Sequence, residues 1–334
     1  MTQLGVLQEG RMGRGPRRRR ARRVRRWRAT GFVVLAVALS LVALLVFMAS
    51  RTSGPTLPSA SHAVGKSHHH TPSTGGYGAT LAAVHVRPRF KQPVQSGLLF
   101  DVHSGKVLWR RNPTTRVPIA SLTKMMTALV VAAHSRPSER VLIRRAAIDY
   151  SGSGVGLLPL HKKVRLETLL YGLMLPSGND AAIALAQHVA GSESHFIAMM
   201  NAKARDMGLS CSHFTTVSGI VDQGNYACAT DLAVMAHAIL SDHRLGHIVA
   251  TSSIVLPFPI KGGKLYLYNN NPLLRTHYRG ADGVKTGYTL AAGRCLVAAA
   301  RRGRKWLAVV LLHSEDPPDQ ATQLLDKGFR TRGA

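Results

Sequence analysis

The sequence contains few cysteines, and this shortage limits what the chain can be. Only three of its 334 residues are cysteine, too few for a fold built from disulfides. Neither a CxxC pair nor an HExxH pattern occurs, and these are common short signatures of metal sites. We therefore expect no metal and no cofactor. The odd number of cysteines allows one disulfide and one free thiol.

Acidic residues are also scarce, with 16 Asp+Glu against 44 Lys+Arg and a formal net charge of +28. The positive charge is uneven, because eleven arginines lie between Arg11 and Arg28. A basic tail alone would suggest binding to nucleic acid. The next segment argues against that partner.

Residues 31–49 read GFVVLAVALSLVALLVFMA and contain no charged side chain. As a helix they would extend roughly 28 Å, close to the hydrocarbon thickness of a bilayer. Arginines before the segment favour a cytoplasmic N-terminus. We therefore expect a basic cytoplasmic tail (1–30), a single transmembrane helix in the cell membrane (31–49) and an extracytoplasmic remainder, with no nucleic-acid partner. A cleaved signal peptide is the alternative.

Residues 50–84 are rich in Ser, Thr, Pro, Gly and His and have almost no branched aliphatic side chains. Such a composition buries too little apolar surface to offset chain entropy, so we expect a flexible linker. The catalytic or binding domain should then occupy residues 85–332.

Periodic patterns in this domain predict strands near both ends and helices in the middle. The expected strands are 98–102, 107–109, 254–258, 265–268, 283–288, 295–300 and 306–312, and the expected helices are 122–130, 166–173, 181–189, 196–207, 232–240 and 320–329. Short turns between the late strands favour antiparallel pairing. The sequence therefore predicts an α+β fold with a mainly antiparallel sheet flanked by helices.

Ser121-Leu122-Thr123-Lys124 is the first motif with possible chemistry. On a helix, residues three apart share a face, so the amine of Lys124 can reach the hydroxyl of Ser121. Serine needs a neighbouring base to become a good nucleophile, and a buried lysine with a lowered pKa can act as one. Alone, the pattern fits a helix cap and a surface lysine equally well.

Two further motifs are Ser177-Gly178-Asn179, in an expected loop between helices, and Lys285-Thr286-Gly287, in an expected strand. Each has an ordinary interpretation, as a capping loop or as an edge strand protected by lysine. Their joint occurrence, in the order Ser-x-x-Lys, Ser-x-Asn, Lys-Thr-Gly, is typical of β-lactamases and penicillin-binding proteins.

The stretches RVPIASLTKMMTALV, LLYGLMLPSGNDAAIALA and GADGVKTGYT resemble the serine-type D-Ala-D-Ala carboxypeptidases among the low-molecular-mass penicillin-binding proteins. The similarity covers about residues 95 to 330. It implies a β-lactamase/D,D-peptidase-like fold with a helical subdomain. It also implies a hydrolase that cleaves the terminal D-alanine from peptidoglycan stem pentapeptides and is acylated by β-lactams.

The resemblance assigns catalytic roles to three residues. Ser121 would attack the carbonyl between two D-alanines, Lys124 would accept its proton, and Ser177 would help to protonate the departing D-alanine. Removal of the terminal residue cannot be separated at this stage from D,D-endopeptidase or transpeptidase action on crosslinks, which share the acylation step. A β-lactamase is a weaker alternative, because no suitable glutamate follows Asn179.

The resemblance also implies a substrate-binding set of Asn179, Lys285, Thr286, Gly287 and Tyr288. In it, the backbone N–H groups of Ser121 and Tyr288 would form an oxyanion hole. Relatives usually carry a basic residue soon after the last strand, facing the substrate carboxylate. Here that region offers only His313, so carboxylate binding would depend on Thr286, Lys285 or an arginine that the sequence does not locate.

Cys211 and Cys228 flank a loop that borders the active site in such relatives. We expect a disulfide between them in an oxidising exterior. We expect Cys295, on a predicted core strand, to be a buried apolar side chain.

Overall fold

The computed structural model describes residues 86–331. The expected tail (1–30), transmembrane helix (31–49) and linker (50–84) therefore lie outside the described residues. Within residues 86–331, no helix combines the length and the apolar character that crossing a bilayer requires.

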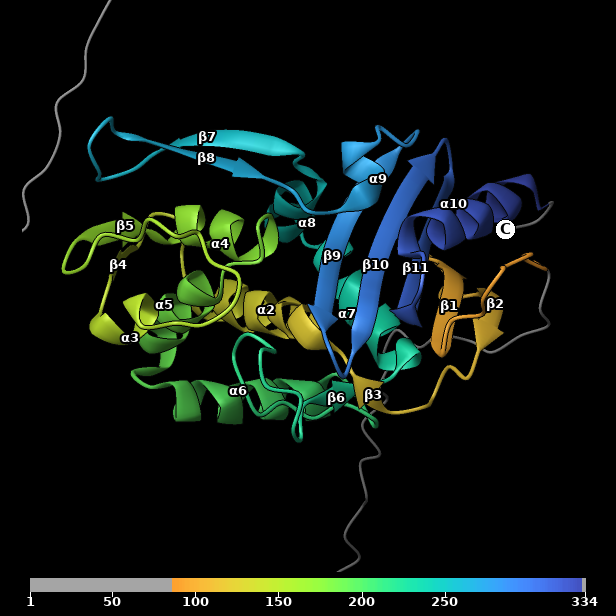
Figure 1. Cartoon of the computed structure of the whole chain (residues 1–334), viewed down its shortest axis with the longest axis horizontal. Helices are drawn as coiled ribbons and strands as arrows, with labels where there is room; N and C mark the ends of the chain where they lie inside the picture. The colour runs from red at the N-terminus through yellow and green to blue at the C-terminus, as the bar shows by residue number, and fades with distance from the viewer. Residues whose placement is uncertain (1–85, 332–334) are drawn as a thin grey trace, which may run out of the picture. The chain divides into compact units, whose positions relative to one another are not determined.

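A five-stranded antiparallel sheet forms one side of the domain, with strand order β2-β1-β11-β10-β9 (Figure 1). Its strands are β1 (Ser96–Asp101), β2 (Val107–Arg111), β9 (Ala281–Thr289), β10 (Gly293–Arg302) and β11 (Lys305–Ser314). Strand β9 therefore lies at an edge, where one side of its backbone has no neighbouring strand in this sheet.

Both faces of the sheet are covered, which explains why its central strands are almost continuously apolar. Along β10, Cys295 and Val297 face a core shared with the helical part, whereas Leu296 and Ala298 face a second core under the C-terminal helix. Successive side chains of a strand point to opposite faces, so one apolar run supplies both cores.

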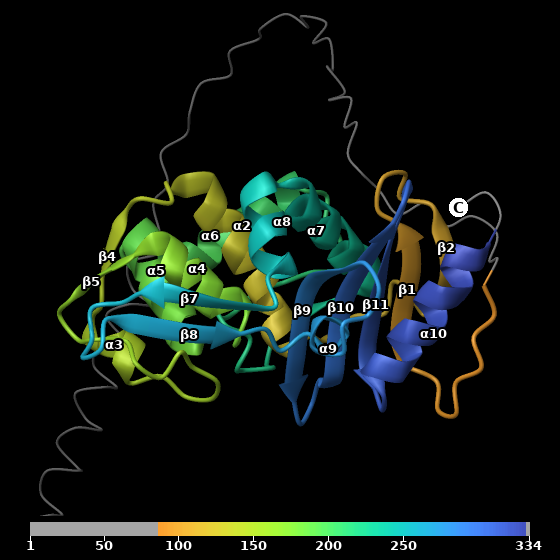
Figure 2. The same cartoon turned by 90° about the horizontal axis from the view of Figure 1, so that it is seen from above.

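Helices fill the other side of the domain, and α10 covers the outer face of the sheet (Figure 2). The helices are η1 (Ala120–Thr123, a 3-10 turn), α2 (Lys124–His134), α3 (Arg145–Ile148), α4 (Leu166–Met174), α5 (Asn179–Ala190), α6 (Glu193–Asp206), α7 (Ala229–Ser241), α8 (His243–Ala250), α9 (Pro272–Arg275) and α10 (Pro317–Arg330). Three small sheets join β3 (Val117–Pro118) to β6 (Tyr226–Ala227), β4 (Arg140–Leu142) to β5 (Lys163–Arg165), and β7 (Ser253–Pro257) to β8 (Lys264–Tyr268).

Local chemistry explains several of these boundaries. Helix α5 ends at Gly191, whose φ of 78° suits glycine and few other residues. The next residue, Ser192, accepts a hydrogen bond from the backbone N–H of His195 and so caps α6. Asp242 caps α8 in the same way through Leu245, at 2.8 Å.

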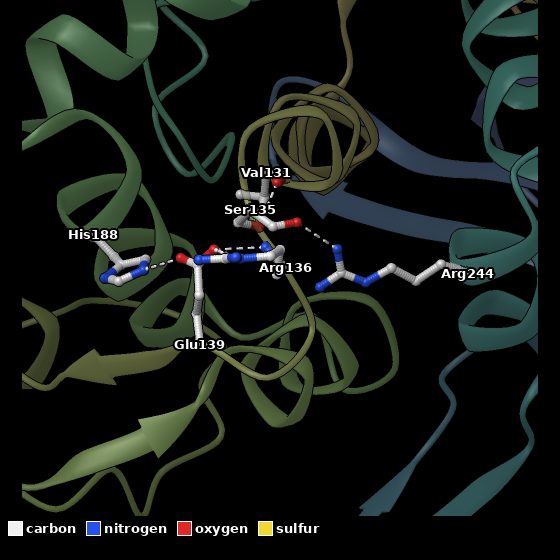
Figure 3. A network of polar contacts seen from close by, with 6 residues as sticks. All are labelled: Val131, Ser135, Arg136, Glu139, His188 and Arg244. Atoms are coloured by element: carbon white, nitrogen blue, oxygen red, sulfur yellow. Dashed lines mark hydrogen bonds and ion pairs between the residues drawn. The ribbon is translucent and has the colours of Figure 1, made fainter.

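A polar network holds the far end of α2 against its neighbours (Figure 3). Glu139 accepts a hydrogen bond from the backbone N–H of Arg136 at 2.7 Å and contacts the His188 ring at 2.8 Å. Arg244 of α8 donates to the carbonyl oxygen of Ser135 at 3.1 Å and to the Glu167 carboxylate at 2.7 Å. Glu139 has a pKa below its usual value, mainly because of the Arg136 N–H and then the His188 side chain.

The predicted α+β fold is confirmed, with a mainly antiparallel sheet, flanking helices and a helical part. Each expected strand and helix overlaps an observed element. The patterns missed α8, a short helix that begins immediately after α7 and shares Asp242 as a boundary. They also missed the one-turn helices α3 and α9 and the short strands β3 to β6.

Candidate active site

Ser121 and Lys124 lie at the junction of η1 and α2, close to the edge strand β9. Ser121 belongs to the 3-10 turn, and α2 begins at Lys124. Lys124 Nζ lies 2.9 Å from Ser121 Oγ. The expected contact between the two side chains is therefore present, although the turn that makes it is 3-10 rather than α-helical at Ser121.

Lys124 is fully buried and has three polar neighbours. Besides Ser121, its amine lies 2.6 Å from Asn179 Oδ1 and 2.8 Å from the carbonyl oxygen of Ser218. Burial lowers the pKa of Lys124 well below its usual value, the charge of Lys285 lowers it further, and Asp180 opposes this change. Burial therefore favours the neutral form of this amine more than it would for an exposed lysine.

The two oxygens of Asn179 and Ser218 determine how a neutral Lys124 must be oriented. Both can only accept, so they take the two N–H groups of a neutral amine. The remaining lone pair then faces Ser121, whose hydroxyl can donate to it. This is the geometry required of a general base beside a nucleophile.

Asn179 itself is held at both ends of its amide. Its Nδ2 donates to the carbonyl oxygen of Ser151 at 2.6 Å, which fixes Oδ1 toward Lys124. Asp180 supports the same region, because its carboxylate accepts from the backbone N–H groups of Val155 and Gly156, each at 2.9 Å. The sequence did not indicate this supporting role for Asp180.

Ser177 lies in the loop between α4 and α5, as expected. Its backbone has a φ of 70°, an uncommon conformation for a residue with a side chain. The side chain is buried, and within residues 86–331 its Oγ has no hydrogen-bond partner. Strained backbone and an unsatisfied buried hydroxyl are features that occur at functional sites.

Lys285 lies on β9 and is 1% exposed. Its Nζ donates to the carbonyl oxygen of Thr286 at 3.1 Å, and burial lowers its pKa to about 7. The pKa of Lys124 is itself affected by Lys285, so the two amines act on the same region electrostatically. Tyr288, three residues further along β9, is 62% exposed.

Gly287 allows β9 to approach η1 closely. A Cβ at this position would lie 3.0 Å from the carbonyl oxygen of Ile119 and 3.1 Å from the backbone nitrogen of Ser121. The Lys285-Thr286-Gly287 motif therefore lies against the motif that begins at Ser121. The backbone on both sides of Gly287 is close to the Ser121 N–H. Together these contacts connect all three motifs around Ser121.

The segment from Val217 to Gly219 completes the site, and it belongs to the loop between Cys211 and Cys228 that the family resemblance places beside the active site. Thr127 Oγ1 donates to the carbonyl oxygen of Val217 at 2.6 Å, and the next carbonyl, of Ser218, accepts from Lys124. Gly219 has a φ of 76°, and a Cβ there would overlap the carbonyl group of Ala120. A backbone carbonyl has no residue signature, so only the fold could identify this contribution.

The loop that carries this segment is closed by a disulfide between Cys211 and Cys228, which confirms the expected pairing. Cys295 is a free, buried cysteine, also as expected. Burial raises the pKa of its thiol to about 12, so it is a poor nucleophile near neutral pH.

Comparisons with known proteins agree with this arrangement. A family profile described as D-alanyl-D-alanine carboxypeptidase matches residues 85–316. The D-alanyl-D-alanine carboxypeptidase DacF of Bacillus subtilis is 33% identical over 243 residues, which cover 70% of this chain and 62% of that protein. DacB2 of Mycobacterium tuberculosis is 36% identical over 245 residues, with 71% and 82% covered.

Solved structures show the same relationship. The Streptomyces K15 DD-transpeptidase aligns with a TM-score of 0.67 at 33% identity, covering 73% of this chain and 100% of that one. A D-alanyl-D-alanine carboxypeptidase from Mycobacterium tuberculosis aligns with a TM-score of 0.67 at 32% identity, covering 74% and 97%. The match to the Bacillus relative spans less than two thirds of that relative's length.

Proposed function

Because this chain belongs to the D-alanyl-D-alanine carboxypeptidase family, we propose that it removes the terminal D-alanine from peptidoglycan stem pentapeptides through an acyl-enzyme on Ser121. The observation that carries this proposal is the buried amine of Lys124, 2.9 Å from Ser121 Oγ. Its other two neighbours are acceptors, which leaves its lone pair for the serine proton.

In the acylation step, Ser121 Oγ attacks the carbonyl carbon between the two D-alanines, and its proton passes to Lys124 Nζ. The backbone N–H groups of Ser121 and Tyr288 stabilise the oxyanion, a contribution of about 3 kcal/mol per donor. The contact of Gly287 with the Ser121 backbone supports this pairing, because it brings Tyr288 close to the nucleophile.

Collapse of the intermediate breaks the C–N bond and leaves an ester on Ser121. The departing D-alanine takes a proton from the Ser177 hydroxyl, which is buried and has no hydrogen-bond partner among the described residues. Ser177 then regains a proton from Lys124, which holds the one taken from Ser121, so both groups return to their starting states. Lys285, with a pKa near neutrality, tunes this proton transfer. Water then attacks the ester and regenerates the serine.

Asn179, Thr286 and Gly287 are proposed to hold the peptide. Gly287 leaves the edge of β9 accessible to an extended substrate backbone, and Thr286 contributes a hydroxyl to the terminal carboxylate. Both ends of the Asn179 amide are engaged by Lys124 and Ser151. Asn179 therefore also orients the amine of Lys124.

Labelling with a fluorescent penicillin tests the nucleophile. The native protein should become labelled, Ser121→Ala should not, and Ser210→Ala, which alters an exposed serine, should behave as the native protein does. Incubation with a pentapeptide muropeptide should then release one D-alanine, measured by mass. Labelling that persists in Ser121→Ala would remove Ser121 from its role.

A transpeptidase is the second candidate, favoured by the alignment with the whole length of the Streptomyces K15 DD-transpeptidase. The two reactions differ only in whether water or a peptide amine releases the acyl group. Adding an acceptor amine to the same assay separates them, because transpeptidation yields a peptide product of higher mass.

The cellular location is also a proposal. Residues 31–49 are uncharged and long enough to cross a bilayer, and arginines precede them. We propose that this segment anchors the protein in the cell membrane with the domain outside. Carbonate extraction of membranes would leave an anchored protein in the pellet, and its appearance in the supernatant would oppose the proposal.

A further inference from the structure

A cavity of about 500 Å³ lies on the face of the sheet that carries Thr286 and Leu296, between β9, β10 and the segment that joins β11 to α10. Helices α9 and α10 both pack on this face (Figure 2). Asn270 also lines the cavity, and it donates through its backbone N–H to Leu175 and through its amide to Pro176, each at 3.1 Å. The cavity therefore adjoins the loop that carries Ser177.

Arg294 is the one cationic side chain among the residues that line this cavity. Its Nη1 donates to the carbonyl oxygen of Glu315 at 2.7 Å. This bond restrains the guanidinium, and the nitrogens that it does not use can serve a ligand. Two acids line the cavity as well: Asp316, whose carboxylate caps α10 through Asp319 at 3.2 Å, and Glu315, which is exposed.

The register of β9 and β10 places Arg294 close to Thr286. Leu296 pairs with Thr286 and Arg294 with Tyr288, without a bulge between them. Arg294 and Thr286 therefore point to the same face as diagonal neighbours, whose Cα atoms are about 7–8 Å apart. An arginine side chain spans that distance, and its planar fork fits a carboxylate with two parallel hydrogen bonds.

Two other basic residues are less suited to hold an anion here. Lys285 points to the opposite face and is buried, and a pKa of about 7 leaves it only partly charged near neutral pH. His313 does not line the cavity; its ring lies against Gly293 instead. The guanidinium of Arg294, in contrast, lines the cavity and offers a planar set of donors that suits a carboxylate.

We propose that Arg294 binds the free C-terminal carboxylate of the peptide substrate, together with the hydroxyl of Thr286. This inference rests on the proposed carboxypeptidase function. It gives Arg294, on β10, the role of binding the substrate carboxylate. Relatives usually give that role to a basic residue soon after the last strand, where this sequence offers only His313. Because Glu315 lines the same cavity with a negative charge, it should weaken the binding of the anion.

The test compares two peptides that differ only at the carboxylate. One ends in D-Ala-D-Ala with a free acid, and the other carries a C-terminal carboxamide. In the native protein, kcat/KM for release of the last residue should be higher for the acid. Arg294→Ala should lower kcat/KM for the acid about 10- to 100-fold, the loss typical of a hydrogen bond to a charged group, and leave the amide almost unchanged.

Three further variants sharpen this result. Arg294→Lys should restore part of the loss, because it keeps the charge but not the planar fork. Glu315→Gln should raise kcat/KM for the acid a few-fold. Arg301→Ala is the matched control, because it removes an exposed arginine from the other end of the same strand and should change neither substrate's rate.

Equal losses for the acid and the amide would overturn the assignment, since they would indicate a structural role for Arg294. An unchanged rate for the acid would overturn it as well. If the native protein released no residue from either peptide, the proposed carboxypeptidase function would fail, and this inference with it. An active native protein in which Arg294→Ala keeps the full native preference for the acid over the amide would refute this inference alone.

Discussion

Replacing Gly287 with alanine would probe how closely β9 must approach the nucleophile. The added Cβ would lie 3.0 Å from the Ile119 carbonyl oxygen, 3.1 Å from the Ser121 nitrogen and 3.2 Å from the Leu122 nitrogen. All three are backbone atoms, so the contact can be relieved only if β9 and η1 separate by a few tenths of an ångström. Such a separation would move the Tyr288 N–H away from the Ser121 N–H.

The expected size of the effect follows from what those two groups are proposed to do. Complete loss of one oxyanion donor typically costs a factor of about 10² to 10³ in rate. Because Gly287→Ala should displace a donor without removing it, we expect acylation to slow by about 10- to 100-fold. The steric cost should lower the free energy of unfolding by about 1–3 kcal/mol.

The assay measures the rate constant for acylation by a fluorescent penicillin, beside a thermal melt of the same sample. Gly246→Ala is a matched control: its Cβ would also lie 3.1 Å from a backbone oxygen, that of Leu240, but in α8. This control should be acylated at the native rate. If Gly287→Ala melts almost normally and is acylated as fast as the native protein, the close approach of β9 has no part in catalysis.

Two further predictions concern charge. Between pH 7 and 10.5, the folded state binds fewer protons at Lys285 than the unfolded state does, since burial lowers its pKa from 10.5 to about 7. The free energy of unfolding should therefore rise with pH in this range, and Lys285→Met should reduce the slope by about 1 kcal/mol per pH unit in urea titrations. Arg244→Leu removes the partner of Glu167 from an ion pair whose side chains are 16% and 24% exposed, and it should lower the free energy of unfolding in urea by about 3 kcal/mol. Arg145→Ala breaks an ion pair whose side chains are 72% and 57% exposed, and it should change the free energy of unfolding by less than about 0.5 kcal/mol. Equal effects of the two arginine variants, or an unaltered pH slope, would contradict these interpretations.

Local sequence patterns were enough to predict much of the fold and the residues at the centre of the site. The contact of Lys124 with Ser121 depends only on a spacing of three residues, and the apolar runs of β10 and β11 are long enough to identify strands. The α+β class then follows from the order of these elements. The joint occurrence of three short motifs was equally visible, although each of them alone has an ordinary structural interpretation.

The order and spacing of residues were thus enough to identify the side chains with the chemistry of an acyl-transfer site and the elements that carry them. Their surroundings were visible only in the folded chain: Lys124 is fully buried, the Ser218 carbonyl orients it, and Arg294 lies beside Thr286. Burial, backbone carbonyls and strand register depend on contacts between residues far apart in the chain. Such contacts leave no local pattern, yet they set the pKa of an amine and the position of a charge.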